Sequence, residues 1–82
     1  MAVKWDLKLW VVEAVRDQGG ESDVLGVAKW IWENHEHDLR ASGDLFYTWQ
    51  YDMRWAAQAL RQEGKLAPTT RGAASRWRLA NS

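Results

Sequence analysis

The sequence contains no cysteine, a single proline and no long run of apolar residues. Without cysteine, neither a disulfide scaffold nor a cysteine-ligated zinc site can hold the chain together. The longest apolar run is Leu9–Val12, which is far shorter than the roughly 20 residues that a membrane-spanning helix needs. The first residues show no basic stretch followed by an apolar one, so we expect no secretion signal and a cytoplasmic location.

The composition describes one small globular domain of 82 residues, 46% of them hydrophobic and 27% charged. A chain of this length buries roughly two thirds of its unfolded surface. That leaves room for three or four short elements, but not for an enzyme pocket together with the layers of residues that support one. The sequence shows neither a serine–histidine–carboxylate arrangement nor a glycine-rich phosphate loop. We therefore expect a protein that is not an enzyme and needs no cofactor.

The net charge is zero, but the charges are unevenly divided along the chain. Residues 1–39 carry four basic and eight acidic side chains, whereas residues 40–82 carry seven basic and three acidic ones. Six of those seven cations are arginine, whose planar fork fits phosphates and base edges. The division predicts one surface that binds an acidic partner and another that avoids it.

Apolar residues recur with helical spacing in three segments. The first helix is expected at about residues 5–18 and ends at Gly19-Gly20, because glycine tolerates the left-handed turn that closes a helix. Ser22 or Asp23 caps a second helix, expected over about residues 23–37. Its inner stripe is Val24, Val27, Ala28 and Ile31.

A break with turn residues at 41–44 precedes a third helix, expected over residues 45–62. This helix has one apolar face, interrupted by Thr48 and Asp52. The apolar residues are Leu45, Phe46, Trp49, Met53, Trp55, Ala56, Ala59 and Leu60. The opposite face carries hydrogen-bonding side chains, namely Tyr47, Gln50, Tyr51, Arg54, Gln58 and Arg61.

Gly64 stops the third helix, and the hydrophobic period then changes from helical to alternating. Trp77 and Leu79 alternate with arginines, which is typical of a half-buried strand. We read residues 65–80 as a two-stranded hairpin with a basic tip at residues 71–74. A lone hairpin is marginal in water, so its apolar residues must pack on the helices. The fold class expected for residues 1–82 is therefore α+β, mainly helical with a small β-hairpin.

Three helices followed by a hairpin is the element order of the winged helix-turn-helix fold. Residues 51–66 (YDMRWAAQALRQEGKL) resemble a recognition helix that runs into the turn before the first wing strand. Residues 71–79 resemble the wing and its return strand. The pattern is similar to the N-terminal winged-helix domain of Mrr-like restriction proteins, over about the last 35 residues. These 82 residues hold no nuclease domain, so the resemblance does not imply cleavage.

The resemblance implies binding of double-stranded DNA, with the third helix in the major groove. Arg54 would then fork onto guanine, and Gln50 and Gln58 would pair with adenine. Thr48, at the start of the helix, would reach a phosphate or a thymine methyl group.

We expect the side chains around these base-contacting residues to bind the DNA backbone. Tyr47 and Tyr51 would donate to phosphates, and Arg61 would contact the backbone where the helix leaves the groove, together with Lys65. The basic wing, with Arg71 at its tip and Arg76 on the return strand, would lie on the backbone or in the minor groove. Such a protein would be a small transcriptional regulator or an accessory DNA-binding factor.

Seven tryptophans are more than a domain of this size ordinarily has. Trp30 and Trp32 lie about 200° apart on a helix, so they cannot both face one core. Trp5 also lies off the inner face of its helix, so at least one indole should be partly exposed. Exposed tryptophans often anchor protein contacts. They support an alternative function, a protein-interaction module that uses these indoles and the acidic N-terminal half, or a homodimer.

The spacing of two histidines argues against a metal site. His35 and His37 are two residues apart, so they point to opposite sides of a helix, whereas zinc-binding pairs lie four apart. A favourable interaction with the dipole at the end of the second helix explains them more simply. We therefore expect no bound metal.

Overall fold

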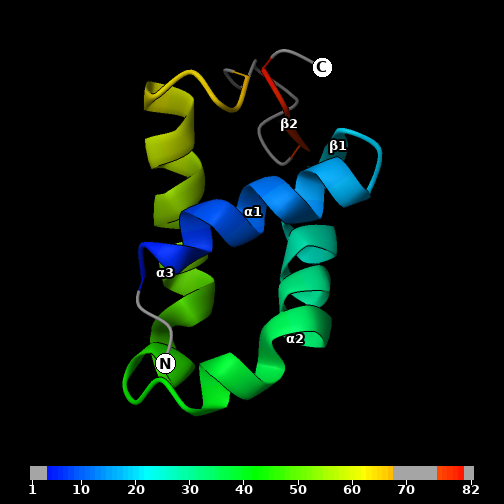
Figure 1. Cartoon of the computed structure of the whole chain (residues 1–82). Helices are drawn as coiled ribbons and strands as arrows, with labels where there is room; N and C mark the ends of the chain where they lie inside the picture. Colours follow the sequence, from blue (N-terminus) through cyan, green and yellow to red (C-terminus); the bar gives the residue numbers. More distant parts are fainter. Residues whose placement is uncertain (1–3, 68–75, 81–82) are drawn as a thin grey trace.

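The computed structural model describes residues 4–67 and 76–80, apart from the side chain of Arg76. This part of the chain contains three helices and a two-stranded antiparallel sheet, in a winged-helix-like layout (Figure 1). The order is α1 (Asp6–Asp17), β1 (Glu21–Asp23), α2 (Val24–Arg40), α3 (Leu45–Gln62) and β2 (Arg76–Arg78). The predicted class, mainly helical with a small β component, is confirmed.

Helix α1 ends where the sequence predicts, at the glycine pair. Gly19 and Gly20 have φ values of +93° and +95°, a region that side chains with a Cβ rarely adopt. The amide of Gly20 donates to the carbonyl of Val15 at 2.9 Å, which closes the last turn of the helix. The buried residues of α1 are Leu7, Trp10, Val11, Ala14 and Val15, which recur at helical spacing.

Strand β1 leads directly into α2 through a side-chain cap. Asp23 has an extended backbone, and its Oδ1 accepts a hydrogen bond from the amide of Gly26 at 2.7 Å. This satisfies one of the free amides at the helix start, as an N-cap does. Ser22 instead donates its hydroxyl to Oε1 of Gln18 at 2.7 Å and thereby ties β1 to the end of α1.

Helix α2 runs to residue 40, beyond the predicted end at about residue 37. It bends at His35, whose φ of −131° and ψ of 18° are not helical, and the ribbon changes direction there (Figure 1). Beyond the bend, Leu39 is fully buried. Arg40 pairs with Glu36 at 2.7 Å and lies over the ring of Trp32. Burial of Leu39 and the pair one turn apart support the extra turn.

A short turn joins α2 to α3, and α3 has the bounds that the sequence predicts. The hydroxyl of Ser42 donates to the carbonyl of Asp38, and Gly43 takes a positive φ of +61°. Two helices joined by a short, glycine-containing turn are the elements of which a helix-turn-helix is built. At the other end of α3, Gly64 has a φ of +78°, and the amide of Lys65 donates to the carbonyl of Leu60.

The sheet contains a strand that the sequence analysis did not predict. Strand β1 pairs with β2, with Ser22 opposite Trp77. Of the predicted hairpin over residues 65–80, the described residues show one isolated bridge, between Leu66 and Leu79, and a hydrogen bond of 2.8 Å from the amide of Ala67 to the carbonyl of Arg78. The two-stranded sheet itself is formed by β1 and β2, not by the two predicted hairpin strands. Residues 76–79 therefore lie between β1 and the segment that follows α3. The predicted wing tip at residues 71–74 lies outside the described residues.

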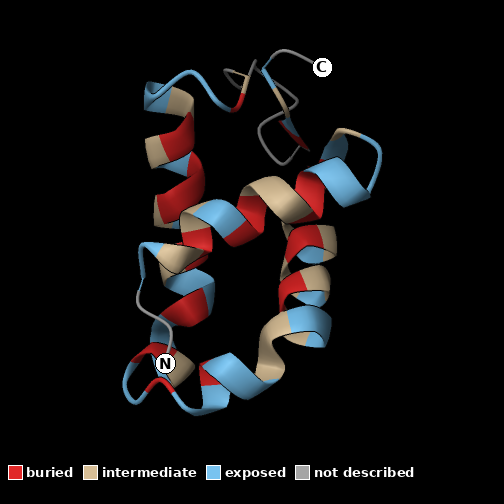
Figure 2. Ribbon diagram, in the orientation of Figure 1, coloured by how far each residue is buried: buried red, intermediate tan, exposed pale blue. Residues whose placement is uncertain are grey.

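A single core lies between the three helices and the sheet, and Figure 2 shows the buried residues of the helices turned toward one another. Helix α1 packs across both α2 and α3 (Figure 1). Trp77 of β2 is only 3% exposed, and its side chain packs in this core and so attaches the sheet to the helices. The core residues outside α1 are Val27, Ile31, Leu39, Leu45, Trp49, Met53, Ala56, Ala57, Leu60, Leu66 and Trp77. Among the described residues, none of the helices has the length and apolar character needed to cross a membrane.

Candidate functional site

The open face of α3 carries two parallel rows of side chains. The polar row is Gln50, Arg54 and Gln58, all exposed. Residues four apart on a helix are neighbours on its surface, so these three side chains follow one another along the helix. Beside them lie Tyr47 and Tyr51, which are 82% and 74% exposed. Five of the sequence-predicted contact residues therefore share one solvent-facing surface, which we call the α3 face.

The tyrosine row continues into an aromatic cluster at the edge of the α3 face. Trp55, one turn beyond Tyr51, meets Trp5 edge to face, with 5.2 Å between ring centroids. Trp5 is 62% exposed, which confirms that at least one indole lies at the surface. The Nζ atom of Lys4 lies 4.3 Å from the centroid of the Trp55 ring. This contact places a cation beside the α3 face that the sequence analysis missed, because its position depends on packing between distant segments.

Arg54 is the cation at the centre of the α3 face. It forms no ion pair with any other side chain that the structure describes. Thr48 is exposed, but its hydroxyl donates to Oδ2 of Asp52 at 2.8 Å. The two polar residues that interrupt the predicted apolar face thus bind each other, and Thr48 must exchange this bond to contact a ligand.

Two of the residues that were predicted to contact the DNA backbone, Arg61 and Lys65, have partners within the chain. Arg61 is half-buried, with its guanidinium carbon 5.8 Å from the centroid of the Trp77 ring. Burial lowers the pKa of Arg61, and its Nε and Nη2 atoms are buried without a hydrogen-bond partner among the residues that the structure describes. Lys65 is exposed and lies 3.7 Å from a carboxylate oxygen of Glu63. The structure therefore separates Arg61 from the open row, whereas Lys65 remains accessible.

The wing residues of the predicted site are not placed. Arg71 lies outside the described residues, and for Arg76 only the backbone, in β2, is described. Arg78, on the same strand, is exposed. The roles of the wing arginines remain predictions.

A shallow apolar hollow of about 420 Å³ borders the α3 face on its α2 side. Trp32 and Trp49 stack in its wall with 6.1 Å between ring centroids. Leu25, on α2, is 62% exposed at this site. Lys29 is exposed beside it, so a second cation stands at the opposite flank of the α3 face from Lys4.

His35 is engaged in packing. Its ring stacks on Trp10, with 4.0 Å between centroids and 9° between planes. Nε2 lies 3.9 Å from Glu13 and Nδ1 lies 3.7 Å from Asp38. Within residues 4–67 and 76–80, no group of three potential ligands is placed to hold a metal ion.

No family model, curated protein or solved structure matches this chain.

Proposed function

We propose that this protein binds double-stranded DNA through the α3 face, without catalysing a reaction, as a small transcriptional regulator or accessory DNA-binding factor. The observation that carries the proposal is the exposed row Gln50, Arg54 and Gln58 on α3, which follows α2 after a short turn in the order expected of a helix-turn-helix. In this arrangement the second helix is the one that enters the major groove.

The dimensions of α3 suit that role. A helix of this width, about 10–12 Å with side chains, fits a major groove about 12 Å wide. Side chains four residues apart are separated by about 6 Å along the helix axis, close to the rise of two base pairs. The polar row can therefore address neighbouring base pairs. Its chemistry suits base edges, since arginine forks onto guanine and glutamine onto adenine.

The flanks of the α3 face provide phosphate contacts. Tyr47 and Tyr51 each expose a hydroxyl that can donate to a phosphate oxygen. Lys4 on one side and Lys29 on the other are exposed cations. On the proposed binding mode these four residues hold the helix in register, and the wing arginines Arg71 and Arg76 add backbone contacts.

The test is a selection for preferred duplexes followed by anisotropy titrations at several salt concentrations. Arg54→Ala should lose about 1–3 kcal/mol on the selected duplex and bind unrelated duplexes nearly as well as the wild type does. Arg71→Ala should weaken all duplexes alike and lower the salt slope by about one. Arg16→Ala is the matched control, since it removes the same charge from an exposed position on α1.

Two results would overturn the proposal. The first is the absence of duplex binding at about 50 mM salt, where phosphate contacts are strong. The second is an equal loss in Arg54→Ala and Arg16→Ala on every sequence, because it would show that net charge alone governs binding.

A further inference from the structure

Beside the residues that α1 buries in the core, Leu9 and Val12 form a second apolar stripe with Trp5, which directly precedes the helix. Val12 is partly buried against the edge of the core. Trp5, Leu9 and Val12 follow one another at helical spacing, and Arg16 continues the line. Leu9 is 59% exposed and Trp5 is 62% exposed. A helix in a small monomeric domain needs one apolar face for the core, so the second stripe calls for another explanation.

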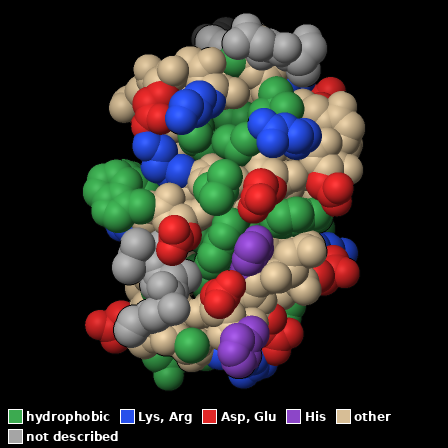
Figure 3. Space-filling view, viewed as in Figure 1, with side chains coloured by type: hydrophobic (Ala, Val, Ile, Leu, Met, Phe, Trp, Pro, Cys, Tyr) green, Lys and Arg blue, Asp and Glu red, His purple; other side chains and the backbone are tan. Residues whose placement is uncertain are grey.

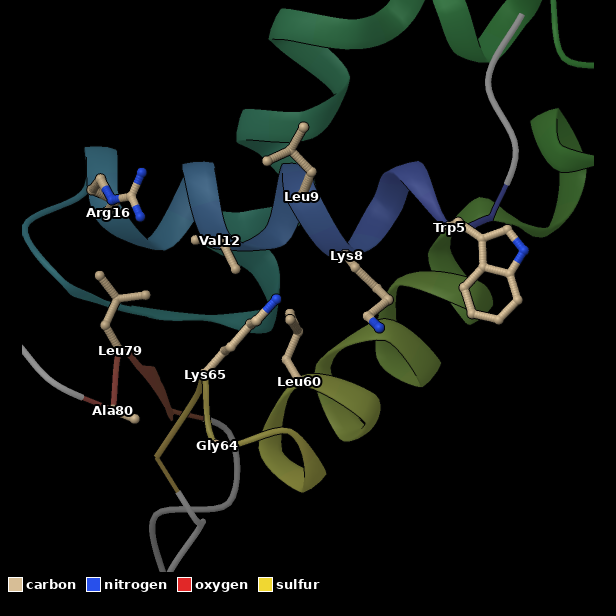
Figure 4. Close-up of a pocket in the computed structure, with 10 residues that line it drawn as sticks. All are labelled: Trp5, Lys8, Leu9, Val12, Arg16, Leu60, Gly64, Lys65, Leu79 and Ala80. Carbon is tan, nitrogen blue, oxygen red and sulfur yellow. The ribbon is translucent and has the colours of Figure 1, made fainter.

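This stripe forms one wall of a groove of about 790 Å³. The opposite wall comes from distant segments: Leu60 at the end of α3, Gly64 and Lys65 after it, and Leu79 and Ala80 at the end of the sheet. Figure 4 shows Val12 and Lys8 directed from α1 toward the side of Leu60 and Lys65. The groove therefore exists only in the folded chain.

The rim of the groove is basic. Lys8, Arg16 and Lys65 line it, and Arg16 forms no ion pair with the rest of the described chain. The neighbouring acid is Glu63, which pairs with Lys8 and lies 3.7 Å from Lys65. Figure 3 shows hydrophobic side chains on the face that α1 crosses, with Lys and Arg side chains along its upper part and Asp and Glu side chains among them.

We propose that this groove, the α1 groove, docks an amphipathic helix of a partner protein whose apolar anchors are flanked by aspartate and glutamate. The apolar floor matches the anchors, as in helix-in-groove recognition. The basic rim matches the acidic flanks, and charge complementarity of this kind selects the partner.

A second copy of this chain fits the groove less well. A two-fold dimer buries the same patch on both subunits. Pairing through the α1 groove would place the basic rim of one copy against the basic rim of the other, and like charges in an interface are unfavourable. The charge of the rim therefore favours an acidic partner of different sequence. Lys65 is the one predicted DNA contact that also lines the α1 groove. The polar row of the α3 face shares no residue with the groove, and neither Leu9 nor Arg16 is a predicted DNA contact, so the inference does not depend on DNA binding.

The test uses a phage-displayed library of random 16-residue peptides, selected on the wild type after depletion on Leu9→Glu. The selected peptides should combine apolar residues at i, i+3 or i+4 and i+7 with an excess of Asp and Glu. A fluorescent copy of the best peptide is then titrated against variants by anisotropy. Leu9→Glu and Arg16→Glu should each weaken binding about tenfold or more, as expected for an anchor or a rim charge.

Matched controls show whether the effect belongs to the α1 groove. Leu25→Glu changes an equally exposed leucine on α2, and Arg54→Glu reverses an exposed arginine on α3; both should leave peptide affinity unchanged. Circular dichroism melting checks that each variant is folded, and the gentler Leu9→Ala and Arg16→Ala should give the same order of effects.

The proposal is overturned if no peptide is enriched, or if the enriched peptides lack acidic residues. It is also overturned if Leu25→Glu or Arg54→Glu weakens peptide binding as much as Leu9→Glu does. Concentration-dependent dimerisation that Leu9→Glu abolishes would assign the groove to a second copy instead. Duplex binding measured on the same variants separates this result from the proposed function, since Leu9→Glu should bind DNA as the wild type does.

Discussion

Gly26 lies so close to Ser22 that a Cβ on residue 26 would stand 2.5 Å from the Ser22 hydroxyl oxygen. The same Cβ would be 2.9 Å from Oε1 of Gln18 and 3.0 Å from Oδ1 of Asp23. These polar atoms form the hydrogen-bonded junction between α1, β1 and α2, to which the Gly26 amide also contributes. The absence of a side chain at Gly26 is therefore what allows the junction to close.

Replacing this glycine with alanine should destabilise the protein. Alanine is favoured over glycine inside a helix by about 1 kcal/mol, but the added methyl group must displace the Ser22 hydroxyl and the Asp23 cap. Loss of a cap costs about 0.5–2 kcal/mol and overpacking costs about 1–3 kcal/mol. We expect Gly26→Ala to lower the free energy of unfolding by about 1–2 kcal/mol in urea titrations. In a Ser22→Ala background the penalty should shrink, and a more stable Gly26→Ala protein would contradict the account.

The indole of Trp77 should be the main attachment of the sheet to the helices. The side chain of Trp77 is 3% exposed, and the guanidinium of Arg61 lies over its ring. The backbone of Trp77 pairs with that of Ser22 across the sheet. Removing a buried aromatic ring costs about 3–5 kcal/mol, so Trp77→Ala should lose much of the cooperative thermal transition. Trp5→Ala, which removes an exposed indole, should change stability by less than about 1 kcal/mol. Equal effects of the two changes in circular dichroism melts would show that the wing is not anchored through Trp77.

The parts of the fold that the sequence predicted are those set by local patterns. The bounds of α3 and the buried face of α1 follow from helical spacing and from glycines that end the helices. Residue type likewise limits the cap of α2 to Ser22 or Asp23, and the structure shows that Asp23 is the one that caps it.

The parts that escaped prediction depend on contacts between distant segments. Glu21–Asp23 has no apolar alternation, and it becomes a strand because β2 pairs with it. Arg61 falls on the open face by helical spacing, but Trp77 from β2 lies against it. Leu9 and Arg16 line the α1 groove only because residues 60–65 and 79–80 fold against that side of α1.

The ion pair between Lys8 and Glu63 should be visible in the titration of the glutamate. The hydrogen bond from Lys8 lowers the pKa of Glu63. A lowered carboxyl pKa contributes stability that is present above the unfolded value, near 4.3, and is lost as the pH falls through the folded value. Lys8→Met should raise the pKa of Glu63, as followed by the NMR shift of its carboxyl carbon. An unchanged pKa would show that Lys8 does not engage this carboxylate in solution.

The two tyrosines of the α3 face should contribute to DNA binding through their hydroxyl groups. On the proposed binding mode, Tyr47→Phe and Tyr51→Phe each remove one donor to a phosphate, which is worth about 1 kcal/mol. We expect each change to weaken all duplexes by a similar factor, without altering sequence preference or the melting temperature. Anisotropy titrations on two unrelated duplexes check this. Variants that bind as tightly as the wild type would exclude the hydroxyls from the interface.

The most direct test of the central claim is an amide NMR titration with a mixed-sequence duplex at low and near-physiological salt. The account predicts shift changes concentrated on residues 47–61 and 70–76, which weaken as the salt concentration rises because phosphate contacts release counterions. The absence of shift changes at low salt, or changes confined to α1 and its groove, would contradict DNA binding by the α3 face.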